Sequence, residues 1–387
     1  MQFTHEHREI QKTLKRFIDE EINPHVDEWE AAEIFPAHEV FKKMGNLGLL
    51  GLCKPEEYGG QGLDYSYSLA MAEALGHIHC GGVPMAIGVQ TDMCTPALAR
   101  YGSEELKRNF LAPAIAGDMV GCIGVSEPAA GSDVSGIKSV ARKDGDDYVI
   151  TGTKAFISGA GATDLLVLMA RTGESGPGGI TAFAIPAQAP GIGYGKKEQK
   201  MGWNSQPTRI VNLDGVRVPA SHRLGQEGEG FRIAMKGLDG GRINIATCSV
   251  GAAQGAFDAA RAHLHDRRQF GRPLADFQAL QFKLADMATE LVAARQMVRL
   301  AASRLDAGDP EASTYCAMAK RYATDAGFGV VNDALQLHGG YGYIREYPLE
   351  RLLRDARVHQ ILEGTNEIMR VIIARRLLDT RRPSDIR

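Results

Sequence analysis

Hydrophobic residues recur at steps of three and four residues through the first third of the chain. The apolar positions that follow Thr4 are Ile10, Leu14, Phe17, Ile18 and Ile22. This spacing places them on one face of a helix, and Asn23-Pro24 is expected to end that helix because proline disrupts a helix interior. Further helices are expected near residues 36–49, 65–76 and 103–116. Residues 1–118 therefore predict an all-α first domain.

The pattern changes between about Met119 and Arg223. Short β-branched runs alternate there with Gly, Pro and Asp, which is typical of a β-rich domain. A hairpin is expected at Asp144-Gly145, with further strands at residues 165–170, 180–185 and 208–213. Residues 119–230 predict a middle domain built as a small β-barrel or β-sandwich.

After the glycine-rich segment 225–230 the apolar residues return to a helical spacing. The clearest run consists of Phe277, Leu280, Leu284, Met287 and Leu291. Gly308-Asp309-Pro310 is expected to end that helix. Residues 231–387 predict a C-terminal four-helix bundle whose apolar faces are of the kind that pack against a copy of themselves. The expected fold class is mainly α with a central β domain.

Composition narrows the class of protein. The 387 residues are 44% hydrophobic and 24% charged, with a formal net charge of -3, as in ordinary globular proteins. The charge does not favour nucleic acid, and no apolar run is long enough to span a membrane. Because the first residues are polar, a cytoplasmic enzyme without a targeting peptide is expected, and a mature mitochondrial protein stays open. The six cysteines lack C-x-x-C spacing and are expected to be reduced; no metal is expected.

Five segments contain candidate catalytic or binding residues. Near the C-terminus, Glu363 stands between Leu362 and Gly364, just before a helix-like run; it is a candidate base, although acidic residues also favour helix starts for structural reasons. The other segments are 126–133, 154–158, 267–272 and 336–342. Taken singly, each of these four segments is also consistent with a structural role. In the same order, these roles are a connecting loop, a strand end, a solvated arginine cluster and a helix-breaking turn.

Together and in this order, the five segments resemble the acyl-CoA dehydrogenase family of flavoenzymes, and the resemblance covers nearly the whole chain. It implies an FAD-dependent oxidoreductase that acts on the CH–CH bond of an acyl-CoA. Glu363 would remove the α-proton, an electron-transferring flavoprotein would accept the electrons, and the chain would form a homotetramer. No G-x-G-x-x-G fingerprint follows an expected strand, so a dinucleotide-binding fold is not expected.

The same resemblance assigns site residues. FAD would be bound by Ile123, Val125, Ser126, Gly131, Ser132, Phe156, Ile157, Ser158, Arg267, Phe270, Phe277, Gln278, Gln336, Leu337, His338, Gly339, Gly340, Thr365, Asn366 and Glu367. The residues from Gln336 to Gly340 would reach the FAD of a neighbouring subunit. The acyl-CoA would be bound by Ser132, Asp239, Gly240, Gly241, Arg242, Leu362 and Arg375. Gly241 occupies the place where a minority of family members carry an alternative base, which leaves that role to Glu363.

Substrate preference is suggested by segments 154–161 and 195–209, which resemble family members that convert isobutyryl-CoA to methacrylyl-CoA in valine catabolism. Leu362 replaces a tyrosine that straight-chain relatives commonly have, consistent with a pocket for a branch at Cα. The alternatives are another short or 2-methyl-branched acyl-CoA and an acyl-CoA oxidase. A DNA-binding relative of the family is disfavoured because the chain is slightly acidic.

Overall fold

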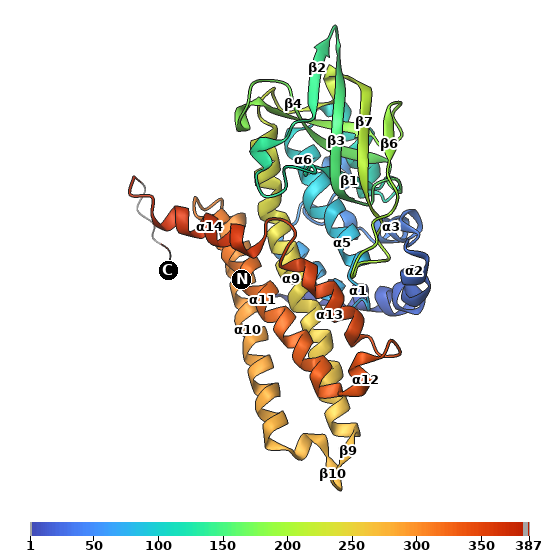
Figure 1. Cartoon of the computed structure of the whole chain (residues 1–387), viewed down its shortest axis with the longest axis vertical. Coiled ribbons are helices and arrows are strands. Elements are labelled where there is room, and N and C mark those ends of the chain that lie inside the picture. Colours follow the sequence, from blue (N-terminus) through green and yellow to red (C-terminus); the bar gives the residue numbers. More distant parts are fainter. Residues whose placement is uncertain (1, 382–385, 387) are drawn as a thin grey trace.

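Three regions follow one another along the chain in the computed structural model, which describes residues 2–381 and 386. Figure 1 shows the β region at one end of the long axis and the long C-terminal helices extending to the other end, with the N-terminal helices packed alongside. Helix α9 begins beside the strands and continues into the helical bundle. This arrangement confirms the fold class expected from the sequence.

The N-terminal region is helical throughout. Its α-helices are α1 (His5–Phe17), α2 (Val26–Ala32), α3 (Ala37–Asn46), α4 (Tyr65–Leu75), α5 (Gly82–Gly88), α6 (Thr95–Tyr101), α7 (Glu104–Leu106) and α8 (Ala112–Ile115). Shorter 3-10 or π-helical turns cover Ile18–Ile22, Asn23–His25, Leu49–Gly51, Glu56–Tyr58, Val89–Cys94 and Lys107–Leu111. The helices expected near residues 36–49, 65–76 and 103–116 are confirmed.

One expected helix end is wrong, and the helices α2, α5 and α6 were missed. Pro24 does not end the first helix, because it lies in the first turn of the 3-10 segment Asn23–His25, where no intrahelical N–H bond is needed. The chain continues helically to Ala32 and turns at Glu33, whose φ is 53°. Helices α5 and α6 gave no periodic signal because nearly every residue from 82 to 98 is buried.

Two half-sheets form the middle region. The strands are β1 (Gly121–Gly124), β2 (Val140–Asp144), β3 (Asp147–Ser158), β4 (Leu165–Arg171), β5 (Ile180–Pro186), β6 (Ile192–Tyr194), β7 (Thr208–Pro219) and β8 (Arg223–Leu224). They pair in the order β6-β7-β3-β2-β4-β5-β8, with β1 parallel to β4. Strands β2 and β4 meet only at Val140 and Arg171, and the expected hairpin turns between Asp144 and Asp147.

The half-sheets face each other across a shared core, as in a β-sandwich. Tyr148 and Ile150 of β3 and Val216 of β7 pack against Leu168 of β4 and Phe183 of β5. The opposite faces of β4 and β5 are buried too, because Val167 and Ala182 pack against Leu98 of α6 and Ile233 of α9. Two-sided burial explains why these strands read as continuous apolar runs in the sequence.

Long helices dominate the C-terminal region. They are α9 (Gly230–Asp266), α10 (Gln278–Asp306), α11 (Ala312–His338), the short α12 (Gly340–Tyr343), α13 (Leu349–His359) and α14 (Asn366–Leu377). A small hairpin, β9 (Arg268–Gln269) with β10 (Arg272–Pro273), joins α9 to α10. Helix α10 ends at Asp306, just before Gly308, as expected. Both α13 and α14 pack against α11; the domain boundaries after residues 118 and 230 stay a prediction.

Among residues 2–381 and 386, no helix is long and apolar enough to cross a membrane. Within the same residues, no three His, Cys, Asp or Glu side chains are grouped so that they could hold a metal ion. All six cysteines are free.

A buried ion pair joins the loop after β1 to strand β3. Lys154 Nζ lies 2.7 Å from Glu127 Oε1, and both side chains are almost fully buried. The Glu127 carboxylate also accepts hydrogen bonds from the backbone N–H groups of Lys138 and Ser139, at 2.6 and 2.9 Å. The pair therefore fixes the loop 126–133 against the strand that carries Phe156.

We expect Glu127→Gln to lower the free energy of unfolding by about 3 kcal/mol, because it leaves the buried Lys154 charge without a counter-charge. The matched control is Asp118→Asn, which removes an exposed ion pair with Lys42 and should cost less than about 1 kcal/mol. Urea unfolding of the FAD-bound variants measures both. Equal effects of the two substitutions would contradict the clamping role.

Candidate active site

A left-handed turn between α13 and α14 carries Glu363. The φ angles of Glu363 and Gly364 are 53° and 88°. A non-glycine residue adopts this region rarely, and such strain concentrates at functional sites. Thr365 then caps α14, its hydroxyl accepting a hydrogen bond from the N–H of Ile368 at 3.3 Å. The turn and the cap together fix the backbone from which the Glu363 side chain extends.

The Glu363 carboxylate is enclosed but unbonded. Although the residue as a whole is half-buried, both carboxylate oxygens are shielded from solvent and have no hydrogen-bond partner among the described residues. The carboxylate packs against Gly241 of α9: a β-carbon placed there would lie 2.2 Å from Glu363 Oε2. Only glycine leaves room for the carboxylate at this position.

Burial dominates the electrostatics of Glu363. Removal of the carboxylate from water raises the pKa of Glu363 to about 8, although the positive charges of Arg242 and Lys320 act to lower it. The negative charge of Asp92 adds to the increase. A carboxyl group with such a pKa binds a proton near neutral pH, which suits a general base.

The α9 residues predicted to bind substrate lie beside Glu363. Arg242 Nη1 donates to Asp239 Oδ1 at 2.9 Å, while Arg242 Nε is buried without a partner. The Tyr65 hydroxyl lies 2.9 Å from both the Gly240 carbonyl oxygen and Asp92 Oδ1. The structure therefore brings Asp239, Gly240, Gly241 and Arg242 together with the predicted base.

Predicted cofactor residues of the middle region converge on the same place. Ile123 of β1 and Val125, just after this strand, pack against the same hydrophobic cluster as Leu362. The pairing of β3 with β7 is irregular between Lys154 and Ile157, and Phe156 at this bulge has a φ of 58° and a side chain 74% exposed. The N–H of Ala155 donates to the Ser126 carbonyl at 2.9 Å, so the loop and the bulge are adjacent.

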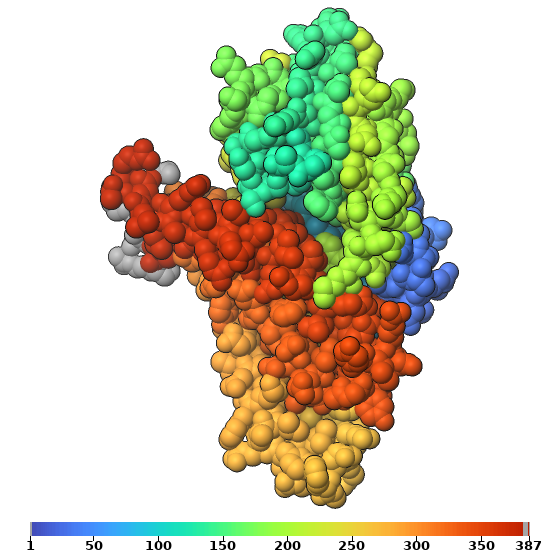
Figure 2. Space-filling view, viewed as in Figure 1, coloured from blue at the N-terminus to red at the C-terminus, as the bar shows by residue number. Residues whose placement is uncertain are grey.

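A hollow separates the loops of the β region from the C-terminal segment on the face shown in Figure 2. The predicted residues around Glu363 and the β region are Ile123, Val125, Ser126, Gly131, Ser132, Phe156, Ile157, Ser158, Leu362, Thr365, Asn366 and Glu367. A large aromatic side chain exposed on a strained residue has little packing reason of its own. The exposed ring of Phe156 therefore fits a planar cofactor.

A second group of predicted residues lies far from Glu363. A pocket at the other end of the bundle is lined by Arg267, Gln336, Leu337, His338, Gly339 and Gly340, together with Tyr341 and others. Nearby, Phe270 is 93% exposed and meets Phe277 edge to face; Gln278 begins α10. Gly241 and Arg267 are about 40 Å apart along α9, at 1.5 Å per residue. One chain does not bring both groups to a single FAD.

Other predicted positions are less informative. Arg375 is exposed and belongs to α14, the helix that extends away from the bundle in Figure 1. Sequence reasoning missed Lys320, Asp92 and Tyr65, which face or support the site. A single lysine or aspartate within a helical pattern gives no local signal that it is buried.

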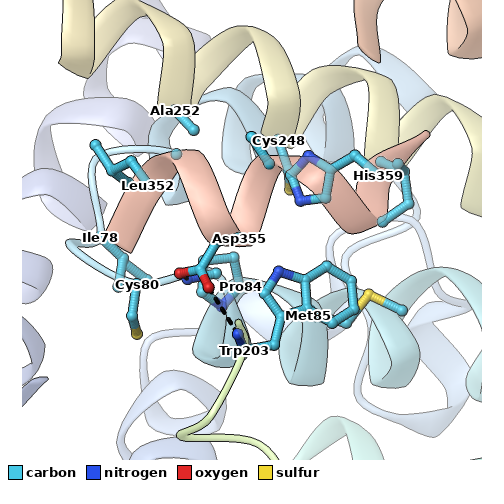
Figure 3. A pocket seen from close by; sticks show the side chains of 14 residues that line it. Ile78, Cys80, Pro84, Met85, Trp203, Cys248, Ala252, Leu352, Asp355 and His359 are labelled. Atoms are coloured by element: carbon cyan, nitrogen blue, oxygen red, sulfur yellow. Dashed lines mark hydrogen bonds between the residues drawn. The ribbon is translucent and has the colours of Figure 1, made fainter. Parts of the chain in front are cut away.

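A separate small cavity lies beside α13, the helix that precedes Glu363 (Figure 3). Asp355 accepts hydrogen bonds there from the N–H groups of Gly81 and Trp203, at 2.7 and 2.6 Å. His359 lies 2.6 Å from the Ser249 hydroxyl, and burial lowers the pKa of His359 to about 3. The imidazole is therefore neutral, and these contacts anchor α13 to its neighbours.

Comparisons with known proteins agree with this geometry. Models of the acyl-CoA dehydrogenase N-terminal, middle and C-terminal domains match residues 4–118, 122–216 and 228–378. The chain belongs to the acyl-CoA dehydrogenase family and is an FAD enzyme, an oxidoreductase that acts on CH–CH donors. The cofactor and enzyme class expected from the sequence are thereby confirmed.

Among its relatives are the mitochondrial isobutyryl-CoA dehydrogenases of Dictyostelium discoideum and Bos taurus. Both are 44% identical over 97% and 98% of this chain, covering 89% and 90% of the relatives. The structure of butyryl-CoA dehydrogenase from Megasphaera elsdenii is 38% identical with a TM-score of 0.94, covering 98% of this chain and 99% of that one. A chain solved in work on the electron-transferring flavoprotein of Acidaminococcus fermentans is 40% identical with the same TM-score and the same coverage.

We expect Gly241→Ala to slow reduction of the bound FAD by a short acyl-CoA by about 100-fold, because the added methyl group displaces the Glu363 carboxylate. Anaerobic stopped-flow absorbance measures the rate. Gly237→Ala is the matched control on the same helix, since a β-carbon there meets no atom within 4 Å. Equal rates for wild type and Gly241→Ala would show that the carboxylate position is not critical.

The raised pKa of Glu363 also predicts a pH-dependent stability difference. The fold favours the protonated carboxyl, so wild-type stability relative to Glu363→Gln is greatest below pH 4.5 and is lost as the pH rises to about 8. The loss is about 1.4 kcal/mol for each pH unit between the two pKa values. Thermal unfolding of both FAD-bound proteins at pH 5 and pH 8 tests this. A difference that is independent of pH would refute the burial of an uncompensated carboxyl.

Proposed function

We propose that the protein oxidises a short acyl-CoA branched at Cα, with isobutyryl-CoA as the preferred substrate and methacrylyl-CoA as the product. The unbonded, enclosed carboxylate of Glu363 is the observation that supports this proposal most strongly. The α-hydrogen of a saturated thioester is a very weak acid, so its removal requires a basic group and a polarised carbonyl. Glu363 is the group in this site with the proton affinity and the free oxygens to take it.

The residues around Glu363 divide the remaining tasks. Its backbone N–H donates to no acceptor within the described part of the chain, so it is free to bind the thioester oxygen and stabilise the charge that develops there. Gly240 and Gly241 leave space beside the carboxylate, and Arg242 supplies a nearby positive charge. Phe156 and Ser158 would hold the flavin end of FAD, which would supply the acceptor for the hydride that leaves Cβ. Exclusion of water by the acyl chain preserves the high proton affinity of Glu363.

The two groups of cofactor residues support an oligomer in which neighbouring subunits complete each FAD site. The group around Phe156 and Ser158 would hold the flavin end, and Arg267 with Gln336 and Gly339 of another subunit would hold the other end. Exposed apolar side chains on the bundle helices, including Phe282, Val292 and Leu377, provide surfaces for such contacts. A tetramer and a cytoplasmic location stay predictions.

Substrate preference depends on the residues next to the base. Leu362 stands beside Glu363 and packs against the same hydrophobic cluster as Ile123 and Val125, which provides an aliphatic wall for a branched acyl group. The identity to isobutyryl-CoA dehydrogenases supports the proposal. A straight-chain substrate such as butyryl-CoA is the second candidate, favoured by the similarity to butyryl-CoA dehydrogenase. A single methyl contact separates the two by only about 1–3 kcal/mol.

An electron-transferring flavoprotein is the proposed electron acceptor, which the similar chain from Acidaminococcus fermentans supports. The alternative is an acyl-CoA oxidase, in which oxygen takes the electrons. Steady-state turnover with and without an electron-transferring flavoprotein under air separates the two. Rapid peroxide formation without the flavoprotein would favour the oxidase.

Glu363→Gln should retain FAD and bind CoA esters, but reduce its flavin about 10²–10⁴-fold more slowly, because it removes the base and nearly preserves its shape. In the wild type, kcat/KM should rise with pH and level off above about 8, since only the ionised carboxylate accepts the proton. Anaerobic bleaching of the flavin absorbance measures the rates. Rapid bleaching of Glu363→Gln would reject the assignment of the base.

The substrate is tested by anaerobic titration with isobutyryl-CoA, butyryl-CoA, 2-methylbutyryl-CoA and isovaleryl-CoA in parallel. The compared quantity is the ratio of the rate constant of flavin reduction to the dissociation constant of the ester. We expect this ratio to be highest for isobutyryl-CoA. A higher value for butyryl-CoA would replace the substrate and leave the role of Glu363 intact.

A further inference from the structure

Lys320 lies in α11, and its side chain is completely buried. Helix α11 packs against α13 and α14, the two helices on either side of the turn that carries Glu363. The ammonium group of Lys320 donates to the Gly364 carbonyl oxygen and to Asn366 Oδ1, both at 2.9 Å. Gly364 follows Glu363 directly in the chain, and Asn366 lies three residues after Glu363. Lys320 therefore connects the long helix to the backbone of the left-handed turn and to the start of α14.

The bonds of Lys320 leave its charge uncompensated. Both of its acceptors are neutral, whereas the nearby Arg242 donates to the carboxylate of Asp239. A buried ammonium group is stable only with a counter-charge close by. The groups that interact electrostatically with Lys320 are Glu363, Arg242, Asp325 and Glu367. Among the acidic groups, Glu363 has the largest effect on the pKa of Lys320.

Lys320 and Glu363 interact without a hydrogen bond between them, since both Glu363 oxygens lack a partner in the described part of the chain. A direct ion pair would occupy the oxygen that must receive the proton. The ammonium group of Lys320 is bonded to Gly364 and Asn366 instead, so its positive charge stabilises the Glu363 carboxylate and leaves the carboxylate oxygens free. The charges that face Glu363 are Arg242, Lys320 and Asp92, and the charge of Arg242 is already paired with Asp239.

We propose that Lys320 is a positioning residue for Glu363: it fixes the left-handed turn through the Gly364 carbonyl and places one positive charge beside the unbonded carboxylate. The inference rests on the proposed function, because it assigns Lys320 a role in setting the proton affinity of the base. Asn366 serves as the second attachment, since its side-chain N–H groups donate to Asp325 Oδ1 at 2.7 Å and to the Thr324 hydroxyl at 3.0 Å.

Two neutral substitutions separate the charge of Lys320 from its hydrogen bonds. Lys320→Met removes both, and Lys320→Gln keeps an N–H donor but no charge. In either variant the rate at pH 7, where wild-type Lys320 carries its charge, should fall about tenfold and recover at alkaline pH, so that the rising limb of kcat/KM moves to higher pH. Lys320→Arg keeps the charge and should leave the rising limb in place.

Lys200→Met is the matched control. Lys200 donates to the Gln206 carbonyl and the Thr208 hydroxyl, and burial lowers its pKa to about 8 as it does that of Lys320, but Glu363 is not among its electrostatic partners. Its loss should leave the pH profile unchanged. FAD content and melting temperature confirm folding in every variant, and Lys320→Gln provides the test where Lys320→Met does not fold.

Anaerobic flavin reduction by isobutyryl-CoA and butyryl-CoA from pH 6 to pH 10 measures these effects, with Glu363→Gln included. A rate loss that is equal at every pH in Lys320→Met and Lys320→Gln overturns the inference, because it shows a merely structural role. If Glu363→Gln reduces its flavin as fast as the wild type, the proposed base fails and the inference fails with it. If Glu363→Gln is inactive but the rising limb of kcat/KM stays at the same pH in the Lys320 variants, the role of Lys320 is rejected and the proposed function stands.

Discussion

The site depends on one constraint: a carboxylate must be kept out of water without being given a hydrogen-bond partner. Desolvation of a carboxylate is unfavourable, so the surrounding structure has to hold Glu363 in place by other means. Its backbone is fixed in a left-handed turn between α13 and α14, and its carboxylate occupies the space that Gly241 leaves on α9. The proton affinity that results is the property a base needs when its substrate is a very weak acid.

The rest of the fold positions this turn. Helix α11 bonds to the residues after Glu363 through Lys320 and Asn366, and the contacts around Asp355 and His359 anchor the helix before it (Figure 3). On the opposite side, the ion pair of Lys154 and Glu127 fixes the loop and the bulge of the β region. The three regions of the chain therefore meet where the carboxylate lies, and each contributes a rigid element.

Sequence patterns predicted the elements that have one polar and one buried face. The spacing of Phe277 to Leu291 predicted α10, and the alternating strands and the hairpin at Asp144 were equally clear. The fully buried strands β4 and β5 were still recognised as short apolar runs. The fully buried helices α5 and α6 were missed because they have no polar face to give a period, and Pro24 lies in a 3-10 turn that a helical pattern does not distinguish from a helix end. For the site, the motifs predicted that Glu363 and Gly241 belong together. They gave no sign of Lys320, because its burial depends on packing between helices distant in sequence.

Difference infrared spectroscopy of the FAD-bound protein, from pH 5 to pH 9 with Glu363→Gln as the reference, tests the central claim most directly. A protonated carboxyl band that is present at pH 6, disappears as the pH passes about 8 and is missing from Glu363→Gln is the result expected for an enclosed base. Absence of that band at pH 6, with an ionised Glu363 already present, would contradict the account.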